Sequence, residues 1–119
     1  MEELTKAEER IMLICWNLKQ AFVKDVIAEM EENPPYNTVS SVVRILEKKG
    51  YLDHETFGNT HRYFPLISKS AYRKFFTKKL LTGYFDNSPA SLVSFLVKEE
   101  NLSEKEKQQL RELIDKTLD

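Results

Sequence analysis

Residues 34–52, "PPYNTVSSVVRILEKKGYL", carry the signals of a helix with a defined beginning and end. The two prolines favour extended backbone just before it, and Gly50 is typical of the residue that follows a helix. Lys48 and Lys49 would lie near the negative end of the helix dipole, where cations are stabilising. The pattern therefore predicts a helix from about Asn37 to Lys49.

This helix has two chemically different faces, because residues three or four apart share a face. One face is apolar and predicts core packing, through Val39, Val42, Val43 and Leu46. The other begins with short hydrogen-bonding side chains and ends in cations, namely Asn37, Ser41, Arg44 and Lys48. Short side chains allow close approach to base edges in a DNA major groove, and Arg and Lys reach phosphates or guanine. We therefore predict a DNA recognition helix.

Two helices are expected before it and a β-hairpin after it. Thr5 and Glu8 form a T-x-x-E capping box at the start of a helix predicted over residues 6–18. A second helix is predicted from Val23 to Glu31 or Glu32, where "NPP" stops it. After the recognition helix, "YLDHETF" and "THRYFPL" are typical of strands, joined by the turn "GN", whose two residues tolerate positive φ.

Three helices followed by a hairpin predict a mainly α fold with a small β-hairpin, a winged helix-turn-helix domain, over residues 1–67. Residues 68–119 are expected to form a helical dimerisation region. Three short helices cannot hide so many apolar side chains within themselves, so we expect a second copy to cover them. The expected interface residues are Phe75, Phe76, Leu92, Phe95, Leu96, Leu110, Leu113 and Ile114.

The sequence offers little for catalysis, cofactors or metals. It has no Gly-rich phosphate loop, nucleophile elbow or paired carboxylates, so we expect no enzyme and no cofactor. Cys15, the single cysteine, lies on the apolar stripe of the first helix and is expected to be a buried, inert thiol. His54 and His61 would share one face of the hairpin, but two imidazoles without a further ligand make a poor metal site. We therefore predict no metal site.

Composition and charge bear on location and partners. No apolar run approaches the roughly 18 residues that span a bilayer, and "MEELTKAEER" does not resemble a signal peptide, so we expect a cytoplasmic chain without membrane insertion. Residues 1–67 contain 8 Lys or Arg against 11 Asp or Glu, a net charge of about −3, although DNA-binding domains usually carry a basic excess. Binding to DNA then depends on cations gathered near the groove side, and we expect Arg44, Lys48, Lys49 and Arg62 there.

Three stretches carry a resemblance that covers nearly the whole chain: "LTKAEERIMLICW", "NTVSSVVRILEKKGYL" and "RYFPL". They resemble the opening helix, the recognition helix and the second wing strand of the penicillinase and methicillin-resistance repressors (BlaI/MecI type), to which copper-transport repressors are related. The resemblance implies that the winged helix binds a double-stranded, dyad-symmetric operator and that the C-terminal helices form a homodimer. The bound dimer would block transcription.

Site residues follow from the resemblance by position. It places Asn37, Thr38, Ser40, Ser41 and Arg44 on the DNA-facing part of the recognition helix. It assigns Asn59, Thr60 and Arg62 to the wing, where family members often have Arg or Lys at the place of Asn59.

The resemblance also offers two regulatory mechanisms. Copper-responsive members carry clustered cysteines near the C-terminus, which this sequence lacks, so metal sensing through thiolates is not expected. Antibiotic-responsive members are cut at an Asn-Phe bond, which would imply a membrane sensor-protease system as a partner. The nearest match here is Ser94-Phe95, and simple packing is the alternative role for Phe95.

Two other functions stay open. The acidic balance of residues 1–67 would also suit a winged-helix module that binds a protein partner. A DNA-binding regulator that senses a small ligand in its dimer cleft is the third interpretation.

Overall fold

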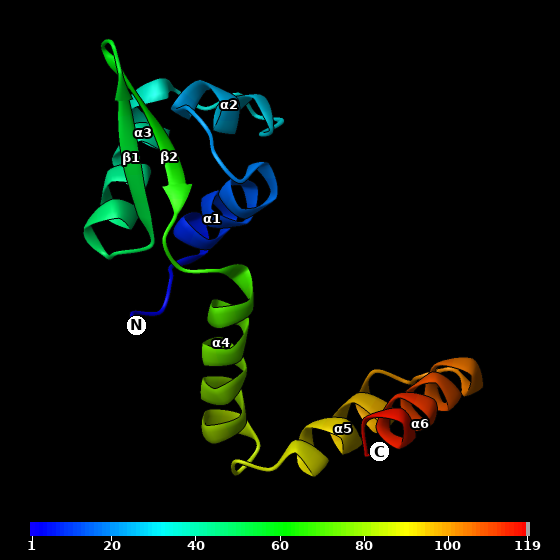
Figure 1. Ribbon diagram of the computed structural model, residues 1–119. Coiled ribbons are helices and arrows are strands. Elements are labelled where there is room, and N and C mark those ends of the chain that lie inside the picture. Colours follow the sequence, from blue (N-terminus) through cyan, green and yellow to red (C-terminus); the bar gives the residue numbers. More distant parts are fainter. Residues whose placement is uncertain (119) are drawn as a thin grey trace. The chain divides into compact units, whose positions relative to one another are not determined.

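The computed structural model describes residues 1–118 as two compact units, which divide between Phe76 and Thr77 (Figure 1). The first unit contains three helices, a hairpin and the start of a fourth helix. Its elements are α1 (Lys6–Leu18), α2 (Val23–Ala28), α3 (Tyr36–Lys48), β1 (Leu52–Phe57), β2 (Thr60–Pro65) and the first part of α4 (Lys69–Tyr84). The predicted fold class, mainly helical with a small hairpin, is confirmed.

Helix α1 has the predicted bounds, and the capping box at its start is formed. The Glu8 N–H donates to Thr5 Oγ1 (3.2 Å), and the Thr5 N–H donates to the Glu8 carboxylate (3.0 Å). Cys15 is buried on the inner stripe, where burial raises the pKa of its thiol to about 11. The predicted burial of Cys15 is therefore confirmed, and the raised pKa disfavours its reactive thiolate form.

Helix α2 ends at Ala28, before the predicted end at residues 31–32. The Met30 N–H donates to the Ile27 carbonyl (2.9 Å), a bond to the third preceding residue that tightens a helix end into a turn. Asn33 then has a φ of +46°. The prolines consequently follow a series of turns and do not themselves end the helix.

Helix α3 begins and ends one residue earlier than predicted, and its C-terminus is a Schellman motif at Gly50, which has a φ of +84°. The Gly50 N–H donates to the Glu47 carbonyl (3.0 Å), and the Tyr51 N–H donates to the Leu46 carbonyl (2.9 Å). The chain reverses there and places the Tyr51 side chain fully inside the core.

Strands β1 and β2 form an antiparallel hairpin, the wing, whose tip projects beyond the helices of the first unit (Figure 1). In the register, His54 pairs with Tyr63. Gly58 has a φ of +60° and Asn59 does not have a positive φ, as in a type II′ turn, so only the glycine of the predicted turn uses left-handed backbone. Ala21 pairs with Tyr63 through two backbone bonds of 2.8 and 2.9 Å and lies beside β2.

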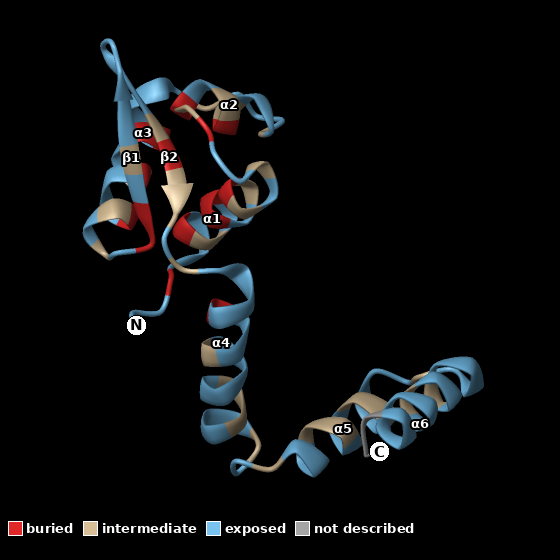
Figure 2. Ribbon diagram, in the orientation of Figure 1, coloured by how far each residue is buried: buried red, intermediate tan, exposed pale blue. Residues whose placement is uncertain are grey.

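The core lies between the inner faces of α1, α2, α3 and the wing (Figure 2). The predicted inner face of α3 is confirmed, with Val42 partly buried and the other three residues buried. The buried apolar residues are Leu4, Ile11, Met12, Cys15, Ala21, Val23, Val26, Val39, Val43, Leu46, Tyr51, Leu52, Tyr63 and Tyr72.

The first part of α4 belongs to this core. Tyr72 is buried, its ring lies 5.7 Å from that of Tyr51 and 5.8 Å from that of Trp16, and its hydroxyl accepts a hydrogen bond from the Leu4 N–H (3.1 Å). The Trp16 Nε1–H donates to the Ile67 carbonyl (2.8 Å). The division between the units therefore lies inside α4, not at the predicted boundary after residue 67.

The second unit contains the end of α4, α5 (Pro89–Glu99) and α6 (Glu104–Leu118). Ser88 caps α5 by accepting from the Ser91 N–H (3.1 Å), and Ser103 with Glu106 forms the predicted capping box of α6. None of the side chains described over residues 77–116 is buried. Among the described residues, no helix is both long enough and apolar enough to cross a bilayer.

Replacing Gly50 by Ala should lower the free energy of unfolding by about 1–2 kcal/mol, because a Cβ disfavours left-handed backbone by that amount. A Cβ at Gly50 would meet no atom within 4 Å, so the loss would come from conformation and not from a clash. Urea unfolding followed by circular dichroism measures the change. Gly50→Asn is the matched control, since Asn tolerates this conformation better; an equal loss in both variants would contradict the interpretation.

A partly buried ion pair links the end of α3 to the start of α1. Lys49 Nζ lies 2.7 Å from Glu8 Oε1, and the Glu2 carboxylate is 3.8 Å away. Burial tends to raise the pKa of Glu8, but the hydrogen bonds from Lys49 and Thr5 outweigh it and hold that pKa below its usual value. The hydrogen bond to Glu8 also raises the pKa of Lys49.

In the variant Glu8→Gln, the free energy of unfolding at neutral pH should be about 1–3 kcal/mol lower than in wild type, because Gln retains the capping geometry and loses the charge that pairs with Lys49. Since the folded-state pKa of Glu8 is lowered, its contribution is complete above the usual value of 4.5 and is lost as pH falls through the folded-state pKa. The difference from wild type should therefore shrink in acid. Urea unfolding at several pH values tests this, with Glu9→Gln as the control. A difference that persisted unchanged in acid would speak against it.

Candidate DNA interface

The outer face of α3 presents the predicted polar stripe. Asn37, Ser41, Arg44 and Lys48 are exposed, and so is Thr38. The Ser41 hydroxyl donates to the Asn37 carbonyl (2.8 Å), so its oxygen can still accept. Pro35 precedes the first turn of α3 and offers it no side-chain cap, but the Thr38 N–H donates to the Pro35 carbonyl (3.1 Å).

Ser40 is much less accessible than the residues of this stripe, since it is only 6% exposed. It lies four residues from both Tyr36 and Arg44 and lines the cleft between α3 and the wing with them.

A polar cleft of about 260 Å³ separates α3 from the wing. From the helix side it is lined by Tyr36, Ser40 and Arg44, and from the wing by Asn59, Thr60, His61 and Tyr63, with Val23 at the edge. Asn59 and Thr60 are exposed at the tip. The structure thus brings Arg44 and these two predicted wing residues to one concave surface.

Arg62 takes a different direction from its neighbours on the wing. It pairs with Glu55 across the hairpin, and its guanidinium lies 4.5 Å from the centre of the Phe57 ring and 3.4 Å from the Glu55 carboxylate. Alternation along β2 places Arg62 on the opposite side of the strand from His61 and Tyr63. Its charge is consequently held on the outer face of the wing.

Lys49 was also expected near the groove side, and this expectation is wrong. Its ammonium group contacts Glu8 at the start of α1 and is only 19% exposed. The stripe of α3 therefore carries Arg44 and Lys48 as its cations.

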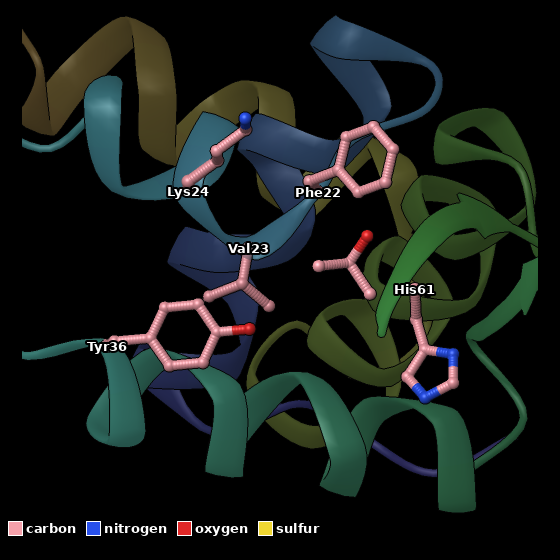
Figure 3. A pocket seen from close by; sticks show the side chains of 6 residues that line it. Phe22, Val23, Lys24, Tyr36 and His61 are labelled. Carbon is pink, nitrogen blue, oxygen red and sulfur yellow. The ribbon is translucent and has the colours of Figure 1, made fainter. Parts of the chain in front are cut away.

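Sequence reasoning missed residues at the first turns of α2 and α3. Phe22, Val23, Lys24, Tyr36, Thr60 and His61 line a pocket of about 140 Å³ (Figure 3). Tyr36 is 53% exposed, and its hydroxyl points into this pocket. Lys24 is exposed, and its ammonium group lies 6.0 Å from the Phe22 ring centre. The position of Tyr36 directly after the prolines could have indicated an exposed residue at the start of α3. The fold places Lys24 and Tyr36 in the lining of the same pocket, which the sequence does not indicate.

Several carboxylates of the first unit are paired within the fold, although each ion pair with Lys or Arg also uses a cation and leaves the net charge unchanged. Glu8 binds Lys49, Glu32 binds Arg10, Glu47 contacts His54, and Glu55 approaches Arg62. The Asp25 carboxylate accepts from the Phe22 N–H (2.8 Å). These contacts partly compensate carboxylate charge within the fold.

Comparison with known proteins agrees with this arrangement. The model of the penicillinase repressor family matches residues 4–116. The methicillin resistance regulatory protein MecI of Staphylococcus aureus (strain N315) is 27% identical over 116 residues, which cover 96% of this chain and 94% of that protein. The penicillinase repressor of Bacillus licheniformis is 24% identical over 115 residues, with coverages of 95% and 90%.

Among solved structures, the DNA-binding domain of the repressor BlaI, determined in solution, aligns with a TM-score of 0.52 and 27% identity. The alignment covers 60% of this chain and 94% of that domain. The resemblance found in the sequence is thereby confirmed. Because the family match spans nearly the whole chain, the protein belongs to the penicillinase repressor family, a family of DNA-binding transcriptional repressors that are not enzymes.

Proposed function

We propose that this repressor binds a palindromic operator as a homodimer, with α3 in the major groove and the wing against the flanking backbone. The observation that carries the proposal is the exposed stripe of Asn37, Ser41, Arg44 and Lys48 beside the polar cleft. Thr38, Asn59 and Thr60 would complete the contact surface. A bound dimer would exclude the transcription machinery from the promoter, in the cytoplasm where the DNA is found.

The stripe suits this role because its two ends differ in chemistry. Asn37 and Ser41 are short and lie on the first turns, where a helix can come close to base edges. Arg44 and Lys48 follow on later turns, and their longer side chains reach guanine or phosphate. Tyr36 and Lys24 line one pocket at the first turns of α3 and α2, and both would contact the DNA backbone.

Arg44→Ala should weaken binding to the operator by about 1–3 kcal/mol, the scale of a good base or charge-assisted contact. Its thermal unfolding should change little, since Arg44 is exposed. A gel shift with the promoter DNA beside the gene measures the affinity, and Lys6→Ala, an exposed cation on α1, is the control. Unchanged affinity of a folded Arg44→Ala protein would remove Arg44 from the interface.

Salt distinguishes this function from the protein-binding alternative. Phosphate contacts release counterions, so specific binding should weaken steeply as salt rises. A flat salt response, or no binding to any genomic fragment, would favour a winged-helix module that binds protein. Calorimetric screening of small molecules addresses the third interpretation, a ligand in the dimer cleft.

The dimer proposal rests on the apolar surface of the second unit. None of its side chains described over residues 77–116 is buried, although the unit is rich in large apolar residues. Tyr84 is 81% exposed and Phe95 is 43% exposed. Leu92, Leu96 and Leu110 are half-buried, and Leu113 and Ile114 are exposed. A stable soluble unit normally buries more than this, so a second copy is the expected cover.

Two of the predicted interface residues lie in the first unit instead. Phe75 is partly buried against the core, and the rings of Phe75 and Phe76 lie 5.9 and 6.2 Å from that of Tyr72. The proposed interface therefore centres on α5 and α6, including the groove lined by Leu96, Leu102, Leu110 and Leu113.

The full chain should sediment as a dimer at micromolar concentration, and the fragment 1–76 should be a folded monomer. The fragment ends at residue 76 because Tyr72 is part of its core. Leu113→Lys should raise the dissociation constant of the dimer at least tenfold, since it places a charge on apolar surface. Leu13→Lys, at an exposed apolar residue of α1, should leave the dimer intact. A monomeric full chain would refute the proposed assembly.

A sensor-protease partner depends on the Ser94-Phe95 bond. Both residues lie inside α5, so a protease would have to unwind this helix to cut between them. The Phe95 ring packs edge-on against Phe85 with centroids 5.5 Å apart. For Phe95 the geometry supports a packing role, and we propose that cleavage, if part of the mechanism, follows local opening of α5.

A further inference from the structure

A cluster of possible metal ligands lies where the last turn of α3 meets the wing. Glu47 comes from α3, and Asp53 and His54 come from β1. His54 Nδ1 is in direct contact with the Glu47 carboxylate, and one ligand atom from each of the three residues lies within 4.8 Å of the others. The sequence pattern indicated only the two histidines at this place, and the fold adds the carboxylates of Glu47 and Asp53.

His61 extends this cluster from the second strand. Thr56 pairs with His61 and His54 with Tyr63, so the two histidines share one face of the wing. Their ring centroids are 4.1 Å apart. The Tyr63 ring borders both, at 5.7 Å from His54 and 6.2 Å from His61.

We propose that Glu47, Asp53 and His54 bind a divalent transition metal such as Zn²⁺, with His61 beside the remaining coordination position. Imidazole nitrogen and carboxylate oxygen are both ordinary zinc ligands, at about 2.0–2.2 Å from the ion. Tetrahedral ligands at that distance are about 3.4 Å apart. The direct His54–Glu47 contact would therefore widen, while longer separations in the cluster, which do not exceed 4.8 Å, would contract. Asp53 is exposed and Glu47 is half-buried, which leaves the carboxylates room to rotate.

Charge supports a cation at this place. The Glu47 and Asp53 carboxylates both carry negative charge within a few ångströms, and like charges at such a distance repel. The Glu47 carboxylate contacts His54 Nδ1, and the Asp53 carboxylate accepts a hydrogen bond from the His54 backbone N–H (2.8 Å). A divalent ion would balance both carboxylates and take the place of the proton between His54 and Glu47.

The consequence for the molecule is a link between α3 and the wing. The ion would join the end of the helix to β1 and so limit their relative motion. Any effect of this metal link on operator binding rests on the proposed function, whereas the metal site itself does not. Metal uptake is therefore measured without DNA, and its failure is distinguishable from a failure of the DNA proposal.

The test uses the full chain without a polyhistidine tag, since a tag would bind metal itself. Zinc chloride is titrated by calorimetry, and Co²⁺ is used as a visible-absorption probe of nitrogen and oxygen ligation. We expect one ion per chain and a higher melting temperature with zinc. Glu47→Gln and His54→Gln should each weaken binding at least tenfold and abolish the zinc-dependent rise in melting temperature.

Glu55→Gln is the matched control. Glu55 is a carboxylate of the same strand, and it pairs with Arg62 on the face of the wing opposite to His54. This variant should bind zinc like wild type. Circular dichroism verifies the fold of each variant, and either Glu47→Gln or His54→Gln suffices if the other does not fold. Absence of zinc uptake by wild type, unchanged binding by a folded ligand variant, or an equal loss in Glu55→Gln would overturn the site.

Discussion

The left-handed backbone at Gly50 is the constraint on which the DNA-binding unit depends. Its Schellman motif ends α3 and returns the chain so that Tyr51 enters the core and β1 begins at the next residue. The same reversal fixes which face of the wing meets α3. The polar cleft and the cluster around Glu47 and His54 both lie where α3 and the wing, the two elements that this turn joins, come together.

A second set of contacts decides how far the DNA-binding unit extends. Tyr51 and Tyr72 meet edge to face, Trp16 holds the Ile67 carbonyl, and Leu4 donates to the Tyr72 hydroxyl. These contacts tie the N-terminal segment and the start of α4 to the three-helix core. The first turns of α4 are therefore structural parts of the winged-helix unit, while the rest of that helix belongs to the second unit.

The two units differ in how their apolar side chains are used. In the first unit, these side chains fill a core, and polar residues remain for the outer face of α3. In the second unit, the described apolar side chains stay exposed or half-buried, as expected of a surface that is completed by another protein chain. Membership in the repressor family agrees with a nucleic-acid surface on the first unit, and the proposed dimer would cover the exposed apolar side chains of the second.

The elements of the first unit, their order and the inner and outer faces of α3 could be predicted from the sequence, because helical spacing, capping boxes and Gly50 are local signals. The family resemblance could also be found there. Three features became visible only in the folded chain, namely the burial of Ser40, the ion pair of Lys49 with Glu8 and the place of Tyr72 in the core. Each of these features depends on a residue that is far away in the chain. The periodicity of apolar residues along a helix or strand cannot specify where such a distant residue will lie. The meeting of Glu47 with His54 has the same physical origin, since the turn at Gly50 must fold before a helix and a strand can share one cluster of ligands.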